Sequence, residues 1–195
     1  MLLDVLGLLS ACSYALDCVE AELVHVSDKH AKRVAYMSVC MAEQLGISGE
    51  SLQDLAACAL LHDNALTQYI QEELHKDVAN APQASQVGIH CTLGEKNIQR
   101  LPFHTDVKNV ILYHHENYDG TGYPANLAGE KIPFGARILR ICDVYCALTS
   151  DRPYRSAFPR EQAMELMTEE VKNFDLKMFL AFQRVIHSGS RKAIE

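Results

Sequence analysis

The sequence lacks the basic tracts that proteins binding long nucleic acids usually carry. Its 195 residues have a formal net charge of −7, and no lysine-arginine run is longer than the pair Lys32-Arg33. Duplex-binding domains present a basic patch or stripe. We therefore do not expect bulk nucleic acid as a partner. An anionic small molecule remains compatible with the composition, because a few cations in a cleft can dominate the local field.

Cysteine pairs at metal-binding or redox spacing are also missing. The seven cysteines form no Cys-x-x-Cys motif. Cys40, Cys58 and Cys142 lie within apolar helical patterns, where cysteine behaves as a small hydrophobic residue. This usage favours a reducing environment, and we expect a cytoplasmic protein.

The N-terminal stretch lacks the features of a targeting signal. The segment MLLDVLGLLSACSYALDC is apolar, but no basic region precedes it and Asp4 interrupts it. It contains too many polar residues for a membrane span. We expect residues 1–27 to form a helix that packs on a domain of residues 28–195. A membrane-associated or dimerisation helix is the alternative, so a homodimer is an open possibility.

Strand-like alternation bounded by hairpin turns is absent, and helical periodicity dominates. The predicted fold is all-α, with about seven to nine helices around a buried site. Helices are expected over 28–45, from about 50 to 62, over 85–100, from about 106 to 115, over the apolar segment after 132, and from about 160 and 175. Residues 64–83 are expected to form a helical fragment and a loop.

Motifs of several common hydrolases are missing too. His115-Glu116 is not followed by a histidine at the zincin spacing, and there is no Gly-x-Ser-x-Gly elbow or glycine-rich phosphate loop. Catalysis by a serine or cysteine nucleophile is therefore not expected.

Histidines and carboxylates gather instead at the ends of predicted helices. His62-Asp63 ends one helix, His114-His115 ends another, and Asp143 lies in the apolar run ILRICDVYCAL. A buried carboxylate is costly unless a cation meets it. Imidazole and carboxylate together suit iron, manganese, zinc or nickel better than calcium. A single histidine is more often a hydrogen-bonded core or surface group, but the joint pattern predicts a metal site.

The remaining histidines outside these motifs are expected to be surface or outer groups: His25, His75, His104 and His187.

The order of these motifs resembles the HD-GYP domain, a subgroup of the HD phosphohydrolase superfamily associated with cyclic di-GMP hydrolysis. The matching stretches are HAKRVA (30–35), LLHD (60–63), HCTLG (90–94), HHENYDGTGYP (114–124), IPFGARILRICDVY (132–145) and ALTSDRPYR (147–155). The resemblance covers roughly residues 28–185 and implies an HD-type helical bundle.

The resemblance also implies two divalent metal ions. Its ligands for the first would be His30, His62, Asp63 and Asp143, and for the second His90, His114 and His115, with Asp63 bridging both. Two such ions activate a bridging water and neutralise a phosphodiester, with His62 and Asp63 as the catalytic pair. Iron or manganese is expected first, and zinc and nickel are the alternatives.

Substrate contacts are implied for four residues. Arg152 and Arg155 match positions that face the substrate phosphates, which suits planar guanidinium groups, although Asp151 could instead pair with one of them. Gly122 and Tyr123 of the loop DGTGYP would line the pocket or meet a partner. A purely structural role is the alternative for this loop.

The sequence departs from the family pattern on the substrate side. HDNAL (62–66) replaces HDIGK, so Leu66 stands where a lysine contacts a phosphate, a loss that can cost on the order of a hundredfold in rate. Val26 replaces a glutamate that binds a third metal in some members, so we expect two metals and no third. Cys146 replaces the second aspartate of the family's DVYDAL.

The leading functional hypothesis is a metal-dependent phosphodiesterase that hydrolyses cyclic di-GMP. One alternative is a signalling or interaction module of weak or no activity, with a protein partner. The other is an HD phosphohydrolase that acts on a different nucleotide, because the pocket rather than the fold decides the substrate.

Overall fold

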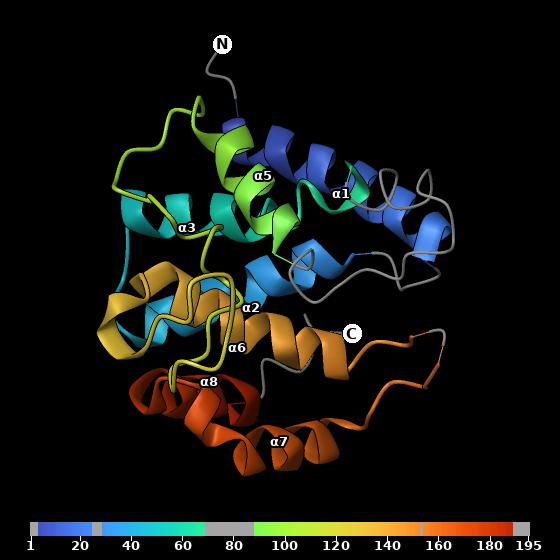
Figure 1. Ribbon diagram of the computed structural model, residues 1–195, viewed down its shortest axis with the longest axis vertical. Coiled ribbons are helices and arrows are strands. Elements are labelled where there is room, and N and C mark those ends of the chain that lie inside the picture. The colour runs from blue at the N-terminus through green and yellow to red at the C-terminus, as the bar shows by residue number, and fades with distance from the viewer. Residues whose placement is uncertain (1–3, 25–28, 69–87, 153, 189–195) are drawn as a thin grey trace.

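The computed structural model describes residues 4–24, 29–68, 88–152 and 154–188, and every regular element in these ranges is a helix (Figure 1). Two isolated β-bridges, Asp119 with Ala128 and Arg152 with Arg155, are the only extended pairings among these residues. The predicted all-α fold is confirmed.

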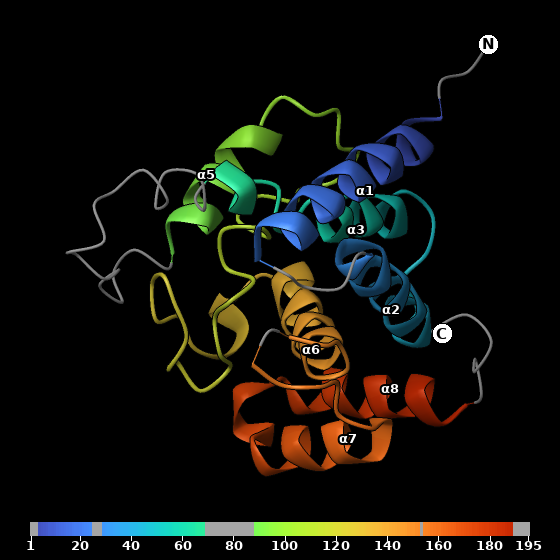
Figure 2. The ribbon, with the colours of Figure 1, turned by 90° about the vertical axis from the view of Figure 1, so that its right-hand side faces the viewer.

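The helices follow in chain order as α1 (Val5–Val24), α2 (His30–Gln44), α3 (Glu50–Leu60), α5 (Ile89–Ile98), η2 (Gly129–Lys131), α6 (Phe134–Leu148), α7 (Arg160–Glu169), η3 (Val171–Asn173) and α8 (Leu176–His187). In both views α1 and α5 lie at one end of the molecule and α7 and α8 at the other, with α2, α3 and α6 between them (Figures 1 and 2).

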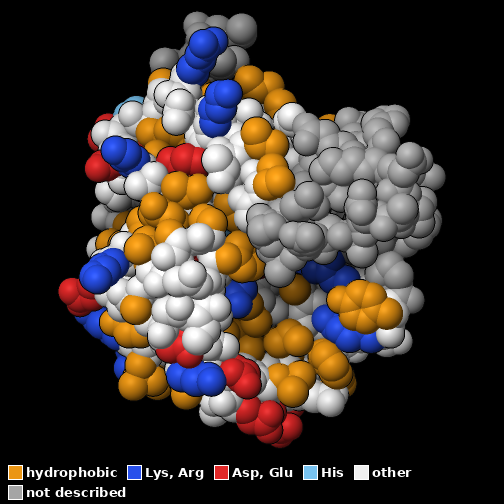
Figure 3. Space-filling model, viewed as in Figure 1, with side chains coloured by type: hydrophobic (Ala, Val, Ile, Leu, Met, Phe, Trp, Pro, Cys, Tyr) orange, Lys and Arg blue, Asp and Glu red, His pale blue; other side chains and the backbone are white. Residues whose placement is uncertain are grey.

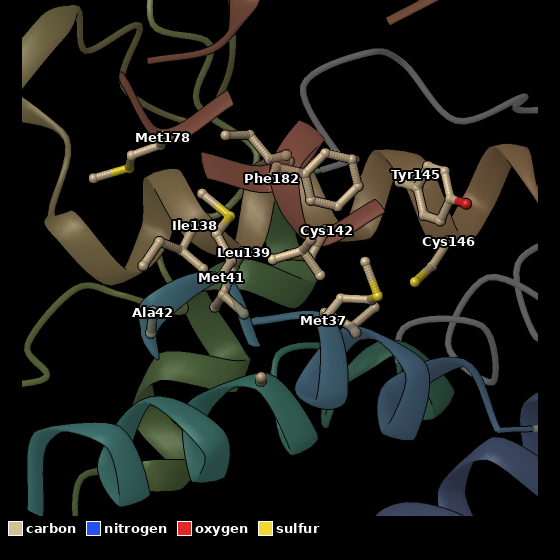
Figure 4. Close-up of a cluster of buried hydrophobic side chains, with 14 of the residues drawn as sticks. Met37, Met41, Ala42, Ile138, Leu139, Cys142, Tyr145, Cys146, Met178 and Phe182 are labelled. Atoms are coloured by element: carbon tan, nitrogen blue, oxygen red, sulfur yellow. The ribbon is translucent and has the colours of Figure 1, made fainter. Parts of the chain in front are cut away.

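The main core lies between α2, α6 and α8. Met37 and Met41 of α2 meet Leu139 and Cys142 of α6, and Phe182 of α8 closes the cluster (Figure 4). These side chains are almost completely buried. Burial of apolar surface on this scale is the main driving force for folding. The packing fixes α6, and therefore Asp143, against α2.

Helix α1 packs on α2 and α3. Its Asp17 is 4% exposed and accepts a hydrogen bond from the backbone nitrogen of Ala31, at 3.3 Å. The described helix ends at Val24, while the predicted boundary at residue 28 falls outside the described residues. Val26 and His25 lie outside them as well.

The predicted helix from about 106 to 115 is wrong. Residues 108–115 form consecutive turns, and Asn109 has a φ of +64° that an α-helix cannot accommodate. The carboxylate of Glu95 accepts the backbone N–H groups of Asn109 and Leu112, at 2.6 and 3.2 Å. These donors are satisfied by a side chain of α5 instead of by a helical ladder.

No helix in the described part of the chain combines the length and hydropathy needed to cross a bilayer. On the face shown in Figure 3, lysine and arginine side chains are scattered among acidic and hydrophobic ones. The described residues of that face therefore form no continuous basic stripe.

Candidate metal centre

Two histidines of the centre are held in the same way by the backbone. Nδ1 of His62, just after α3, lies 2.8 Å from the carbonyl oxygen of Ala59. Nδ1 of His114 lies 2.6 Å from the carbonyl oxygen of Ile111. A carbonyl can only accept, so each Nδ1 carries a proton, and Nε2 is the nitrogen that can bind a metal once it has no proton of its own. Both imidazoles are therefore oriented to bind a metal through Nε2.

The carboxylate of Asp63 lies between three of these rings. Its Oδ2 is 3.2 Å from Nε2 of His62, while its Oδ1 is 3.7 Å from Nε2 of His114 and 3.8 Å from Nε2 of His90. One carboxylate thus faces histidines from three separate segments. This is the position that the resemblance implies for a bridging ligand.

Asp143 of α6 forms the second acidic focus. Its Oδ1 lies 3.2 Å from Nε2 of His30, the first residue of α2, and 4.0 Å from Nε2 of His62. Its Oδ2 lies 3.9 Å from Nδ1 of His115. The fold therefore brings all the ligands predicted from the motifs into one buried cluster.

The imidazoles of His90 and His115 contact each other within the centre. Their Nε2 atoms are 3.1 Å apart. Cys91 places its Sγ 3.4 Å from Nε2 of His90, so a thiol also lies in this half of the centre. Sequence reasoning missed Cys91, although its position next to a predicted ligand in HCTLG was a signal.

The donor set fits divalent metal ions. Nε2 of His62 and Nε2 of His114 are buried, yet neither forms a hydrogen bond within the described part of the chain. A buried polar nitrogen without a hydrogen-bond partner is costly, and a metal ion bound in place of any proton on it would satisfy both. The ligating atoms of His30, His62 and Asp143 lie within 4.8 Å of one another, as do those of a second group around His90 and His114.

The surroundings of His62 and His115 shift their pKa values in opposite directions. Burial would lower the pKa of His62, but the carboxylates of Asp63 and Asp143 outweigh it and raise that pKa to about 10. Burial and the neighbouring His114 hold the pKa of His115 well below its usual value.

The pKa values of the two carboxyl groups in the centre are both lowered. Burial would raise the pKa of Asp63, but His62 and His114 hold it well below its usual range. His30 and His115 likewise outweigh burial and lower the pKa of Asp143. Both carboxylates are therefore ionised at neutral pH, as metal ligands must be.

A second residue that sequence reasoning missed, the carboxylate of Asp17, lies beside the centre. Burial raises the pKa of Asp17, while its hydrogen bond from Ala31 and the nearby His30 lower it. Oδ2 of Asp17 and Nδ1 of His30 are both buried without a hydrogen bond among the described residues. Nothing in the local sequence of α1 marks this aspartate as different from a surface residue.

The loop DGTGYP is fixed by a buried carboxylate behind the ligands. Glu116, which is 1% exposed, accepts hydrogen bonds from the backbone nitrogens of Ala125 and Leu127, at 2.6 and 3.0 Å. A Cβ at Gly122 would lie 2.2 Å from the backbone nitrogen of Asn117 and 2.5 Å from the carbonyl oxygen of His115. Gly122 therefore has a structural requirement, whatever it contacts in a complex.

Tyr123 lies against the ligands. Its ring centroid is 4.8 Å from that of His115. Burial raises the pKa of its phenol, so this group stays protonated and can donate a hydrogen bond. Its predicted role in the substrate pocket stays a prediction.

The two predicted phosphate-binding arginines differ in their surroundings. The guanidinium of Arg155 donates to the carbonyl oxygens of Ala147, Leu148 and Ser150, at 2.7, 3.1 and 3.3 Å, and so covers the end of α6. Arg152 pairs with it through the backbone. Asp151 accepts the backbone nitrogen of Ala157, at 2.8 Å. A substrate role stays a prediction for both arginines.

The remaining predicted positions are distributed as follows. Leu66 is partly buried just after Asp63, Ala65 is buried, and Cys146 is buried in the hydrophobic core. His104 is exposed and lies 3.7 Å from Glu50, away from the cluster. His187 is exposed at the end of α8, and His75 and Lys76 lie outside the described residues.

The comparisons with known proteins agree on one family. A model of the HD domain family matches residues 17–178. A cyclic di-GMP phosphodiesterase of Pseudomonas aeruginosa is 32% identical over 164 residues, which are 80% of this chain and 38% of the relative. The 3'3'-cGAMP-specific phosphodiesterase 3 of Vibrio cholerae is 32% identical over 161 residues, 81% of this chain and 35% of the relative. The chain spans less than half the length of these relatives.

Solved structures show the same fold. The crystal structure of a cyclic GMP-AMP-specific phosphodiesterase of V. cholerae superposes with a TM-score of 0.68 at 19% identity, over 95% of this chain and 49% of that one. An HDG"Y"P protein of Bdellovibrio bacteriovorus superposes with a TM-score of 0.59 at 21% identity, over 80% of this chain and 51% of that one. These structures share the fold, and the family match, the relatives and the motif order show that this chain belongs to the HD domain family, within its HD-GYP group.

Proposed function

We propose that this chain is a metal-dependent phosphodiesterase that hydrolyses a cyclic dinucleotide, with cyclic di-GMP as the first candidate. The observation that carries the proposal is the buried cluster in which the carboxylates of Asp63 and Asp143 face imidazoles from separate segments. The relatives named as cyclic di-GMP or 3'3'-cGAMP phosphodiesterases support this substrate class.

The residues of the centre would bind two metal ions. His30, His62, Asp63 and Asp143 would hold one divalent ion, and His90, His114 and His115 would hold a second, with Asp63 shared. When bound, such ions supply a water nucleophile and neutralise the phosphodiester as it is attacked. The backbone carbonyls of Ala59 and Ile111 keep the Nε2 lone pairs of His62 and His114 directed inward.

This division of roles explains why the chain needs no nucleophilic side chain. Burial raises the pKa of the Cys91 thiol, so it is not ionised by its protein surroundings alone. The hydrolytic group would be water, and the side chains would orient, neutralise and exclude solvent. Iron or manganese is the first metal to test, with zinc and nickel next.

The direct test is turnover by metal-loaded protein. Purified protein would be reconstituted with iron or manganese under reducing conditions, and the conversion of cyclic di-GMP would be followed by chromatography. We expect linear dinucleotide or mononucleotide product that a His62→Ala/Asp63→Ala variant does not form. Equal product in both proteins, or none in either, would remove the proposal for this substrate.

A second candidate function is a signalling module that binds a cyclic dinucleotide but hydrolyses it slowly or not at all. Leu66 favours it, because an apolar side chain stands where the family pattern has a phosphate-binding lysine. Replacing one preorganised charge can change the rate by on the order of a hundredfold. Leu66→Lys should therefore raise turnover without altering metal content. Tight binding with no turnover in either form would favour the module.

The substrate within this class is best settled by a panel. The relatives divide between cyclic di-GMP and 3'3'-cGAMP, and one relative is named a cyclic di-GMP phosphodiesterase response regulator, from Xanthomonas campestris. Parallel assays with both cyclic dinucleotides and with linear nucleotides would rank kcat/KM. A preference for a linear nucleotide would instead support a different HD phosphohydrolase activity.

A further inference from the structure

Cys91 belongs to the centre by position, but the ligand set implied by the family resemblance does not include it. It is completely buried in the first turn of α5, directly after His90. Ligating atoms of His90, Cys91, His114 and His115 all lie within 4.8 Å of one another. The group therefore offers a thiol together with three imidazoles.

The surroundings of Cys91 differ from those of the other buried cysteines. Cys58, Cys142 and Cys146 are members of the main hydrophobic cluster, whereas Cys91 belongs to neither hydrophobic cluster among the described residues. Its Sγ lies 3.4 Å from Nε2 of His90. A role as an ordinary apolar core residue therefore explains Cys58 better than it explains Cys91.

The distances match those between two ligands of one ion. Zinc binds sulfur at about 2.3 Å and imidazole nitrogen at about 2.0 to 2.1 Å, so a sulfur and a nitrogen on one ion lie roughly 3.1 to 3.5 Å apart for angles between 90° and 109°. Two nitrogens on one ion lie roughly 2.9 to 3.3 Å apart by the same geometry. The observed separations are 3.4 Å for Cys91 Sγ to His90 Nε2 and 3.1 Å for His90 Nε2 to His115 Nε2.

We propose that Cys91 binds, as a thiolate, the metal ion held by His90 and His115. The proposal rests on the function proposed above and deepens it. On binding, the Sγ–H bond breaks, the proton leaves to solvent, and the sulfur lone pair forms the bond to the metal. Thiolate is a softer ligand than carboxylate or imidazole, so this half of the centre would prefer zinc, cobalt or ferrous iron to manganese.

Cobalt(II) provides a test that does not depend on activity. A thiolate bound to cobalt gives a charge-transfer band in the near ultraviolet, while imidazole and carboxylate ligands alone give only the weaker visible bands. The full chain would carry Cys12→Ser and Cys18→Ser, because these two exposed thiols could bind cobalt by themselves. In this background, Cys91→Ala would be compared with Cys58→Ala, which removes an equally buried helical thiol from outside the cluster.

We expect the charge-transfer band in the background protein and in Cys58→Ala, and its loss in Cys91→Ala with the visible bands retained. Visible bands without any charge-transfer band in the background protein would overturn the thiolate proposal while leaving the metal centre intact. Absence of both sets of bands would overturn the metal centre and the thiolate together.

Two further measurements keep the proposal testable if Cys91→Ala does not fold. X-ray absorption at the zinc edge of the background protein should show a sulfur neighbour at about 2.3 Å, and a shell of nitrogen and oxygen alone would contradict us. Cys91→Ser should reduce the preference for zinc over manganese by about tenfold or more, since even outer-shell losses change metal affinity by that much. An unchanged preference would count against the thiolate.

Discussion

Single residues in this centre are restrained mainly by backbone atoms. The imidazoles of His62 and His114 are oriented by carbonyl oxygens of the preceding turn. The backbone of the loop after His115 passes so close to Gly122 that no side chain fits there. Small shifts of the backbone are therefore expected to change the positions of the ligating histidines.

Gly122→Ala should destabilise the protein and disturb His115. The added Cβ would lie 2.2 Å from Asn117 N and 2.5 Å from both Glu116 Cα and the His115 carbonyl oxygen, all of them backbone atoms. Because backbone cannot move aside as a flexible side chain does, we expect a loss of about 3 kcal/mol or more. Chemical denaturation would give the stability, and metal analysis would show reduced content.

Gly129→Ala is the matched control in the same loop region. It has a φ of +62°, but no atom lies within 4 Å of the place its Cβ would take, so only backbone strain of about 1 to 2 kcal/mol is expected. Equal losses for the two variants would show that the close approach at Gly122 costs no more than the backbone strain at Gly129, and would contradict this explanation for Gly122.

Arg155→Lys should lower stability more than it weakens substrate binding. Its guanidinium donates to carbonyl oxygens at the end of α6, including Ala147 at 2.7 Å, and lysine cannot reproduce this planar fork. We expect a loss of about 1 to 3 kcal/mol, the usual cost of losing hydrogen bonds to a charged group. Thermal unfolding and KM for cyclic di-GMP would be measured together. A large rise in KM at unchanged stability would instead place Arg155 on the substrate.

At the scale of whole elements, three carboxylates, those of Asp54 and Glu116 buried and that of Glu95 partly buried, replace regular helical hydrogen bonds. Glu95 of α5 satisfies the turns that carry His114, Glu116 satisfies the loop DGTGYP, and Asp54 of α3 accepts the backbone nitrogens of His104 and Thr105. Each carboxylate joins a helix or ligand segment to an irregular one. The irregular segments are therefore held by the helices, which keeps their histidines in place.

Glu95→Gln should loosen the segment that carries His114 and His115. The carboxylate accepts Asn109 N with Oε1 and Leu112 N with Oε2, while an amide offers one oxygen and presents an N–H₂ group to the other donor. We expect a loss of about 1 to 3 kcal/mol. Weaker metal binding should accompany it, because α5 also carries His90.

Glu165→Gln, on the exposed face of α7, provides the control and should leave both stability and metal binding unchanged. Hydrogen exchange of residues 108–115 would locate the effect. Exchange that is equally slow in the Glu95 variant and the original protein would contradict the role given to this carboxylate.

The elements also show what sequence patterns could and could not predict. The helices containing Met37, Leu55 and Leu139 were predictable because each buries an apolar stripe with helical period. The turns at 108–115 were not, because their stability depends on Glu95, which is distant in sequence. The helix-end pairs and the apolar run pointed to His62, Asp63, His114, His115 and Asp143 as candidate ligands, and the family resemblance added His30 and His90. Cys91 and Asp17 required knowledge of which helix faces meet in space.

At the scale of the whole molecule, a cluster of buried charges couples metal binding to the release of protons. The pKa of His62 is raised to about 10, so in the metal-free protein this histidine carries a proton at neutral pH. Its contribution to stability is full below its unfolded value of 6.5 and is lost as the pH rises through about 10. The lowered pKa values of Asp63 and Asp143 contribute stability above 3.8, which is lost as the pH falls below that value.

The metal-free protein should therefore keep these contributions between about pH 4 and pH 7 and lose them on either side. Metal binding removes the contribution of protonated His62, because a metal at Nε2 of His62 must displace its proton. His115 has a lowered pKa and is already neutral, so it should release none. The affinity for metal is expected to rise with pH until His62 has lost its proton.

Proton release on metal binding tests this cluster as a unit. At pH 7 we expect about one proton from His62 and about one more from the Cys91 thiol, because each ligand must be deprotonated. Titration calorimetry in buffers of different ionisation enthalpy counts them. Cys91→Ala should reduce the number by about one, and Cys58→Ala should leave it unchanged. A binding heat that is the same in every buffer would contradict a protonated His62, and an unchanged count in Cys91→Ala would remove the thiol from the ligands.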